Sequence, residues 1–467
     1  MIRTFRLTRL TLALGLAFGL TAQATAATWN LQDSSARKTT IENQLIQFNQ
    51  SLDSTNRENK YSQMETSAFV FYRGTAHIYY YDLDQQNTIA GSPYQNGDAV
   101  TWIQGDMHTN NFGAFDNDEE KVVYDLNDFD EAWVTSYLYD VWRAGASLVL
   151  VARENGGFGN SNINSILNTF GETYLDTLED YRGNSDEKGA EVKESNAYGL
   201  LDEFLHDAES DNSRKDMLAK WTNKGSSSRY FDLSMDNLGS ISASEYATIE
   251  SAINGYKDNL ASSLAGDSSY FEVHDIAERL NAGVGSLGTQ RYYVLIEGET
   301  SSMDDDRILD VKLQGTPAVY PYLSASQQQN VTAEIADMGC RVAIAQKAML
   351  TNVDDHLGCA SIYGDSYSVR ERSPFKETFD TTDLTSMTRF TKMAEQWGKI
   401  LATAHARADK DFDSALVPTQ FESVMHDLTD GEHSEFRSEL RDIAKGYADQ
   451  VEADYNFFVQ LRNSGAL

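Results

Sequence analysis

A short apolar strand that runs directly into a polar loop is the feature that most constrains the fold of this sequence. The stretch "TWIQGDMHTNNFGAF", Thr101 to Phe115, passes from apolar residues into a Gly, an Asp, a His and two Asn. The runs "NFGAF" and "KVVYDL" then predict two short strands around the acidic turn "DNDEE". Such a hairpin folds the acids of "YDLNDFDEA" back over the polar loop, so we expect Asp106, Asn111 and Asp128 to lie together.

The residue types in these two segments indicate a cation site. Carboxylate and amide oxygens suit a hard, oxygen-seeking ion such as Mg²⁺. The alternative is that these acids and amides only cap turns, as Asp and Asn often do. His108 in the same loop is expected to support it through a hydrogen bond rather than to bind metal.

A glycine-rich run, "GVGSLG", lies much later, at Gly283 to Gly288. A dinucleotide fold would need a strand before these glycines and a helix after them. Here two predicted strands follow instead, "TQRYYVLIEG" and "ILDVKLQ", and the second carries Lys312. A lysine in mid-strand needs a partner if it is buried. We expect Glu334, on a helix predicted from about Ala325 to Leu350, to pair with it; the alternative is a solvated lysine on an edge strand.

Both segments resemble parts of the kinase fold, in the variant of aminoglycoside and choline kinases, where "HGDxHxxN" precedes "IDF" or "IDW". The resemblance implies that Asp106 is the base that accepts the substrate hydroxyl proton, and that Asn111 and Asp128 hold magnesium. It also implies a structural role for Asp140 in "YLYDVWRAG" beneath the loop. Gln104 departs from the pattern, because related kinases carry His there.

The glycine-rich run fits the same resemblance. It implies that the loop covers the phosphates of a nucleotide and that the lysine of the third strand contacts them. The implied nucleotide-binding residues are Gly283, Gly285, Ser286, Gly288, Lys312 and Glu334.

The order of the segments differs from that of ordinary kinases, in which the glycine-rich part comes first. The helix "AEQWGKILATAHARAD" resembles the one that elsewhere leads into the catalytic loop, so we expect its end at His405 to approach Trp102 and Ile103. The predicted fold is therefore α+β, a two-lobed protein-kinase-like fold that is circularly permuted and carries extra helices. The expected divisions are a signal peptide (1–26), helices with the catalytic and metal loops (27–280), a Gly-rich β-sheet lobe (281–380), and C-terminal helices that complete the helical lobe (381–467).

The whole pattern, "FYRG…GDMHTNNFG…YDLNDFDEA…DVWR…GVGSLG…VK…AHAR", resembles the bacterial family known as domain of unknown function twenty-two fifty-two, from about residue 60 to 455. That family carries no established activity.

The kinase resemblance implies binding of Mg²⁺ with ATP or another nucleotide, and phosphoryl transfer to a hydroxyl of an unknown small molecule or protein. A second reading is an exported, non-catalytic protein that uses the cleft for another phosphorylated ligand, because the periplasm holds little ATP. A third, metal-dependent phosphoester hydrolysis, would need additional His-rich motifs, and we find none in the sequence.

The N-terminus predicts export to the periplasm or the medium. "MIRTFRLTR" supplies three Arg, "LTLALGLAFGL" a short apolar core and "AQATA" small residues for cleavage after Ala26. Loss of this segment changes the formal charge from −33 to −36, and so acidic a chain repels nucleic acid and anionic lipid. No apolar run is long enough to span a membrane. Cys340 and Cys359 pair or stay free, since sequence does not report their distance.

Overall fold

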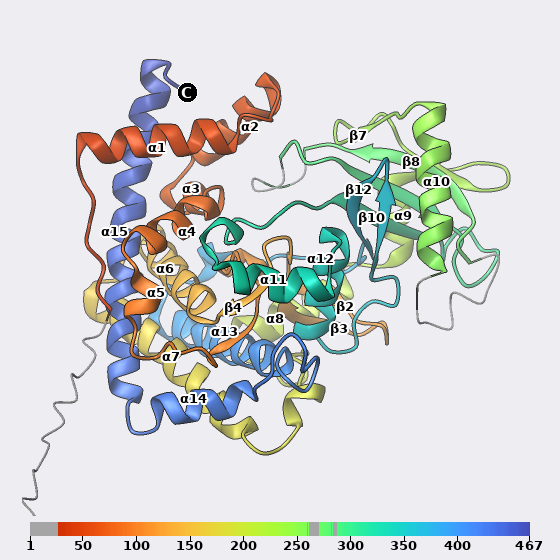
Figure 1. The fold of residues 1–467 in the computed structure, drawn as a ribbon. Helices are drawn as coiled ribbons and strands as arrows, with labels where there is room; N and C mark the ends of the chain where they lie inside the picture. Colours follow the sequence, from red (N-terminus) through yellow and green to blue (C-terminus); the bar gives the residue numbers. More distant parts are fainter. Residues whose placement is uncertain (1–26, 259, 261–269, 282, 284–286) are drawn as a thin grey trace, which may run out of the picture.

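The protein has an α+β fold, as the sequence predicts, with helices gathered on one side and a sheet on the other (Figure 1). The computed structural model describes residues 27–467 except 259, 261–269, 282 and 284–286. The expected signal peptide, residues 1–26, lies outside the described residues.

The described N-terminal segment begins with four helices, and the short helix α5 follows them before the first strand. The polar region from 28 to 66 forms two helices, because Asp53 caps a new one by accepting from the backbone N–H groups of Thr55 and Asn56. The aromatic-rich run after it is also helical. The bounds are α1 (Ser35–Phe48), α2 (Ser54–Met64), α3 (Ala68–Arg73) and α4 (Ala76–Gln85).

Four long helices build the main core. They are α6 (Leu138–Asn155), α7 (Asn160–Tyr181), α13 (Met387–Arg407) and α15 (His433–Ser464). Helix α6 ends where Gly156 follows it with a φ of 70°, a conformation that favours glycine. Helices α13 and α7 approach closely at Gly398, where a Cβ would lie 2.5 Å from the carbonyl oxygen of Phe170. The shorter helices are α5 (Thr88–Gly91), α8 (Leu200–Ser210) and α14 (Phe421–Thr429).

A six-stranded antiparallel sheet forms the other side, in the order β11-β12-β10-β9-β8-β7. It includes strands before residue 281, the expected boundary, because β8 pairs with the predicted strand β9 and β7 pairs with β8. The bounds are β7 (Leu238–Gly239), β8 (Val273–Arg279), β9 (Arg291–Ile296), β10 (Arg307–Leu313), β11 (Gly358–Ile362) and β12 (Asp365–Glu371).

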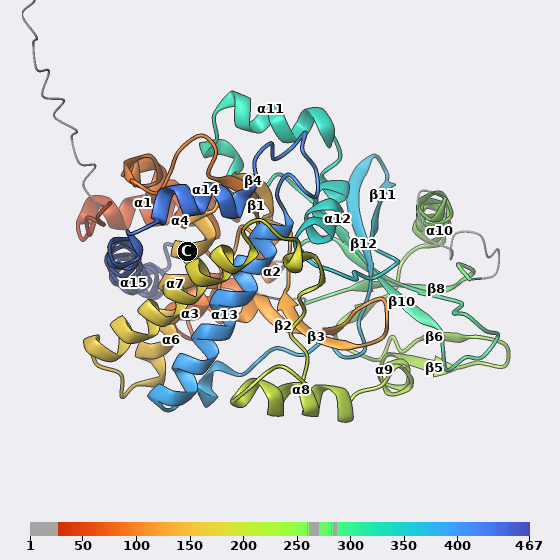
Figure 2. The ribbon, with the colours of Figure 1, turned by 90° about the horizontal axis from the view of Figure 1, so that it is seen from below.

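Helices cover both faces of this sheet. Apolar residues of α10 (Ala243–Lys257) pack on one face. On the other face lie α9 (Arg214–Trp221) and the hairpin of β5 (Thr222–Lys224) and β6 (Arg229–Phe231), beside β8 (Figure 2). In the strand order, β10 lies between β9 and β12. Lys312 of β10 thus belongs to a central strand and not to an edge strand.

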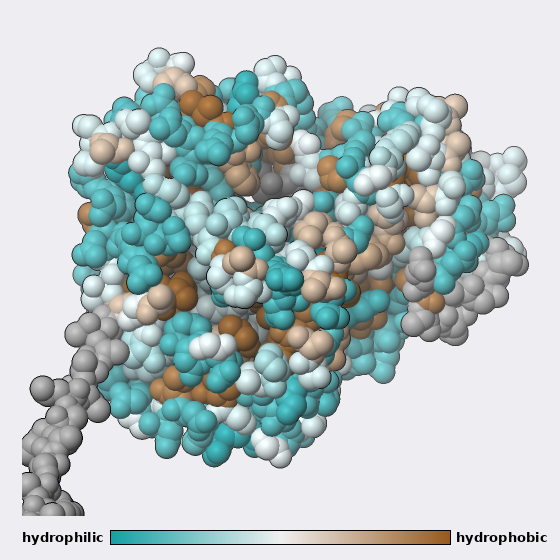
Figure 3. Space-filling model, viewed as in Figure 1, coloured by the Kyte–Doolittle hydropathy of each residue, from teal (hydrophilic) through white to brown (hydrophobic). Residues whose placement is uncertain are grey.

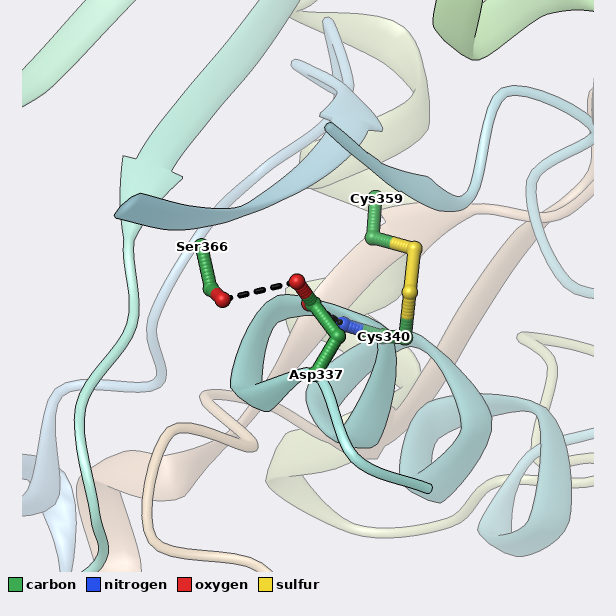
Figure 4. The surroundings of a disulfide bond; sticks show 4 residues. All are labelled: Asp337, Cys340, Cys359 and Ser366. Atoms are coloured by element: carbon green, nitrogen blue, oxygen red, sulfur yellow. Dashed lines mark hydrogen bonds between the residues drawn. A yellow bond between two sulfur atoms is a disulfide. The ribbon is translucent and has the colours of Figure 1, made fainter. Parts of the chain in front are cut away.

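The single helix predicted from Ala325 to Leu350 is two helices, α11 (Ala325–Glu334) and α12 (Met338–Met349). Asp337 causes the break, because its side chain accepts from the backbone N–H of Cys340 and begins a new helix (2.8 Å). Cys340 forms a disulfide with Cys359 of β11, so the question left open by the sequence is settled in favour of pairing (Figure 4). Ser366 also donates to Asp337 (2.7 Å), and both links fix the start of α12 to the sheet.

Two small antiparallel pairs connect the helices to the sheet. The predicted hairpin is confirmed as β2 (Phe112–Asp116) and β3 (Val122–Leu126), and β1 (Val100–Ile103) pairs with β4 (Trp133–Ser136). The end of α13 meets β1 as expected, since Thr101 Oγ1 donates to the carbonyl oxygen of His405 (2.8 Å).

Hydrophilic side chains cover most of the face seen in Figure 3, with scattered apolar ones between them. Over the described part of the chain, none of the helices combines the length and the apolar character needed to cross a membrane.

Candidate functional site

Residues from both predicted motifs line one cleft of about 670 Å³. Asn111 and Asp128 lie on the side of the helices, and Gly283 and Lys312 belong to the sheet side. Because these side chains are far apart in the chain, only the tertiary fold brings them together.

Lys312 links the two sides of the cleft. Its Nζ lies 3.8 Å from Asp128 Oδ1 and pairs with Asp130 Oδ2. Gln314 Nε2 donates to the other oxygen of Asp130 (2.8 Å). Burial would raise the pKa of Asp130, but the charge of Lys312 and the hydrogen bonds lower it to about 2.

The predicted pairing of Lys312 with Glu334 is wrong. Glu334 is exposed at the end of α11, a helix that packs beside β4 rather than on the sheet. The acid that replaces it, Asp130, comes from "DFDEA". Sequence reasoning stopped at Asp128 and missed this neighbour, two residues further along the same loop.

The loop that carries Asp106 is held from below by Asp140. The fully buried Asp140 carboxylate accepts from the backbone N–H groups of Gln104 (2.6 Å) and Gly105 (2.9 Å). Gly105 has a φ of 90°, and a Cβ there would lie 2.1 Å from the carbonyl oxygen of Glu131. This residue must therefore be glycine. The supporting role expected of Asp140 is borne out by these bonds.

Gln104 connects the Asp106 loop to the Asp128 loop. Its Oε1 accepts from the backbone N–H of Asp106 (2.9 Å), and its Nε2 donates to the carbonyl oxygen of Asn127 (3.1 Å). Asp128 itself has a φ of 60°, a left-handed conformation that Asp tolerates better than most residues. Gln104 therefore supports the loop, although it differs from the His of the kinase pattern.

Asp106 lies at the inner end of this group. Burial raises its pKa to about 6, although Arg143 Nε donates to its Oδ1 (2.7 Å) and opposes the rise. Asn111 Nδ2 donates to the backbone carbonyl of Asp106 (2.8 Å), which leaves the amide oxygen as the ligand atom of Asn111. Asp106, Asn111 and Asp128 therefore lie together as predicted.

His108 was expected to support the loop through a hydrogen bond, but its Nδ1 has no hydrogen-bond partner among the described residues. Its Nε2 lies 3.7 Å from Asp106 Oδ2, beyond hydrogen-bond distance. Burial, followed by the charges of Arg73 and Arg143, holds the pKa of His108 well below its usual value. This imidazole is a neutral, buried part of the loop wall.

Several cations of the cleft were not recognised in the sequence, because they come from separate segments. Arg73 of α3 lies close enough to Asp106 and Asp128 for their charges to affect its pKa. Repulsion from Arg370, desolvation in the cleft and repulsion from Arg291 lower the pKa of Lys376 to about 7. Lysine and arginine side chains therefore line the cleft together with its acids.

The glycine-rich run is only partly described. Gly285 and Ser286 lie outside the described residues. Gly283 lines the cleft, whereas Gly288 packs beside α2, where a Cβ would lie 2.5 Å from Leu52 Cδ2. Gly288 is therefore explained by a close contact with α2 and not by the cleft.

The fold and this site define an α+β protein with an acid- and amide-lined cleft that is closed by a lysine from a central strand. The chain belongs to the family DUF2252, described as an uncharacterised protein conserved in bacteria, which matches residues 53–461. No curated protein and no solved structure matches the chain.

Proposed function

We propose that this protein is a kinase-like phosphotransferase that binds a magnesium nucleotide, ATP or another, and transfers a phosphoryl group to a hydroxyl of a small molecule or protein. The observation that carries the proposal is the approach of Lys312 Nζ to Asp128 Oδ1, at 3.8 Å within one cleft. Kinases use such a strand lysine for the nucleotide phosphates and such an aspartate for the metal ions that bridge them.

The roles follow from the positions of the oxygens. Asp128, with its side chain about half exposed to the cleft, and Asn111 Oδ1 would hold Mg²⁺, which prefers oxygen ligands. Asp106 would accept the proton of the acceptor hydroxyl. A pKa raised to about 6 supports this role, because a general base works best with a pKa near the operating pH.

We further propose that the fold is a circularly permuted kinase-like fold. Three features support it: a glycine-rich run between β8 and β9, a lysine on the next strand, β10, and the contact between His405 and Thr101. Chain ends that lie close together make such a rearrangement feasible. Here α1 near the start packs on α15 at the end.

A non-catalytic binding protein for another phosphorylated ligand is the second candidate. The ion pair between Asp106 and the buried Arg143 favours it, because this pair stabilises the charged carboxylate and so opposes proton uptake. Arg73 and Lys376 would suit an anionic ligand in either case.

We also propose that the protein is exported to the periplasm or the medium. The Cys340–Cys359 disulfide supports this, since stable disulfides form in oxidising compartments.

A thermal-shift screen of the protein from Ala27 onward, against nucleotides with and without Mg²⁺, tests the function. A ligand at a hundred times its dissociation constant adds about 2.7 kcal/mol of stability. A shift that requires both nucleotide and Mg²⁺, with phosphoryl transfer in a radiolabelled assay, is the expected result. Stabilisation by phosphorylated ligands without any transfer would favour the binding protein, and no stabilisation by any of them would overturn both.

A further inference from the structure

A second group of metal-ligand side chains lies on the sheet and is not part of the cleft lining. His274 belongs to β8, Glu297 follows β9 directly, and Asp306 precedes β10. One potential ligand atom from each residue lies within 4.8 Å of those from the other two. The three side chains therefore come from β8, from the residue after β9 and from the residue before β10, and they meet at one place.

A β-bulge directs His274 to this point. Val273 pairs with Ile296 and Asp275 pairs with Leu295, so His274 is an extra residue in β8. Bulges commonly redirect a side chain near a functional site. His274 Nε2 lies 2.8 Å from Glu297 Oε2.

The buried carboxylate of Asp306 is a second, independent observation that points to a ligand at this position. It is 1 % exposed, and its Oδ2 has no hydrogen-bond partner among the described residues. A buried oxygen without a partner costs about 1–3 kcal/mol, and more when it is charged. Burial raises the pKa of Asp306 to about 6, with His274 and Arg229 opposing the rise and Glu297 and Asp305 adding to it.

We propose that His274, Glu297 and Asp306 bind a divalent transition-metal ion of the Zn²⁺ type, with the fourth position open to water. One imidazole nitrogen and two carboxylate oxygens form a ligand set that suits zinc. Mg²⁺ prefers oxygen ligands alone, so this site differs from the one proposed at Asp128 and is independent of it. The bound ion would join β8 to the β9–β10 hairpin and give Asp306 Oδ2 its partner.

Another cluster, Asp354, His356 and Glu371, provides a matched control. Both nitrogens of His356 are already engaged, Nδ1 with Asp354 (2.7 Å) and Nε2 with the hydroxyl of Tyr270 (2.9 Å). Glu371 is paired with Arg307 (3.0 Å). Unlike Asp306, both carboxylates of this cluster thus already have partners, His356 for Asp354 and Arg307 for Glu371, so we expect no zinc there.

The test is a zinc titration of the untagged, EDTA-dialysed protein without nucleotide, followed by calorimetry and by thermal unfolding. Wild type should bind one equivalent of Zn²⁺ and unfold at a higher temperature with it. Asp306→Asn and His274→Gln should each weaken zinc binding at least about tenfold and lose that shift. His356→Gln should keep both. If one of the two ligand variants fails to fold, the other carries the test.

Without zinc, Asp306→Asn should be as stable as wild type or more so, because it removes an unpartnered buried carboxylate. The proposal is overturned if wild type shows no zinc-dependent shift, if both ligand variants keep it, or if only His356→Gln loses it. None of these outcomes bears on nucleotide binding, which is measured separately.

Discussion

Lys312 Nζ lies 3.8 Å from Asp128 Oδ1, so a central strand of the sheet and a loop beside the helices meet at one ion pair. Lys312 also pairs with Asp130 of the same loop. These contacts hold the two sides of the cleft together, and under the proposed function Lys312 would contact the phosphates of the nucleotide.

Replacing Lys312 should destabilise the protein in a pH-dependent way. The folded-state pKa of Asp130 is about 2, so its stabilising contribution is present above its unfolded value near 4 and is lost as the pH falls from about 4 to 2. We expect Lys312→Met to lower the free energy of unfolding at pH 7 by about 1–3 kcal/mol, since Asp130 is partly exposed. Urea unfolding at several pH values measures this.

The difference between Lys312→Met and wild type should shrink below about pH 4. Lys220→Met is the matched control, because Lys220 is an exposed lysine of α9. A difference that stays constant from pH 7 to pH 3 would show that the lysine does not act through Asp130.

Phosphoryl transfer, if it occurs, should depend on the ionisation of Asp106. Burial raises the pKa of this carboxyl to about 6, and only the deprotonated form accepts a proton. The rate should therefore fall about tenfold per pH unit below 6 and level off above it. Asp106→Asn should lose about 10²- to 10⁴-fold in turnover and keep its nucleotide affinity. Equal losses of affinity and turnover would assign Asp106 to binding instead.

The disulfide should contribute measurably to stability. Cys340 and Cys359 are 19 residues apart in the chain, and closing a loop of this size stabilises by about 3 kcal/mol. Dithiothreitol should lower the unfolding temperature of wild type but not that of the double variant Cys340→Ser/Cys359→Ser. If dithiothreitol lowers the unfolding temperature of both proteins equally, its effect does not come from reduction of the Cys340–Cys359 disulfide.

Arg37 joins the first helix to the last one. Its Nε donates to Asp454 of α15 (2.9 Å) and its NH2 group to Asp82 of α4 (2.6 Å), all three side chains being buried. Arg37→Met leaves two buried acids without their cation, so we expect a loss of about 3–5 kcal/mol in unfolding free energy.

Arg153→Met is the control for Arg37, because Arg153 also pairs with acids of α15 but at the surface. It should cost no more than about 1 kcal/mol. Similar losses in both variants would mean that burial of the Arg37 ion pairs does not increase their contribution to the free energy of unfolding.

Local patterns in the sequence predicted the elements that depend on local interactions. The β2–β3 hairpin, strands β9 and β10 and the end of α6 at Gly156 follow from periodicity and turn residues. The break between α11 and α12 was missed although Asp337 is a recognisable helix cap.

Partners that come from distant segments were harder to predict. Glu334 was chosen for Lys312 because it is near in sequence, whereas the fold supplies Asp130 from the opposite side of the cleft. The Asp106–Asn111–Asp128 group was predictable because one hairpin joins its members. The bulge at His274 leaves no mark in the sequence pattern, since it depends on the register with β9.

Calorimetric titration with a non-hydrolysable ATP analogue tests the central claim most directly. Wild type should bind the analogue with Mg²⁺ and not with EDTA. Asp128→Asn should abolish this binding without lowering the unfolding temperature, because Asn tolerates the left-handed backbone at this position and the side chain is about half exposed. Asp355→Asn, which changes another exposed acid of the same cleft, should bind as wild type does. Magnesium-dependent nucleotide binding at Asp128 would be contradicted if Asp128→Asn gave an unchanged isotherm, or if wild type bound the analogue equally well with Mg²⁺ and with EDTA.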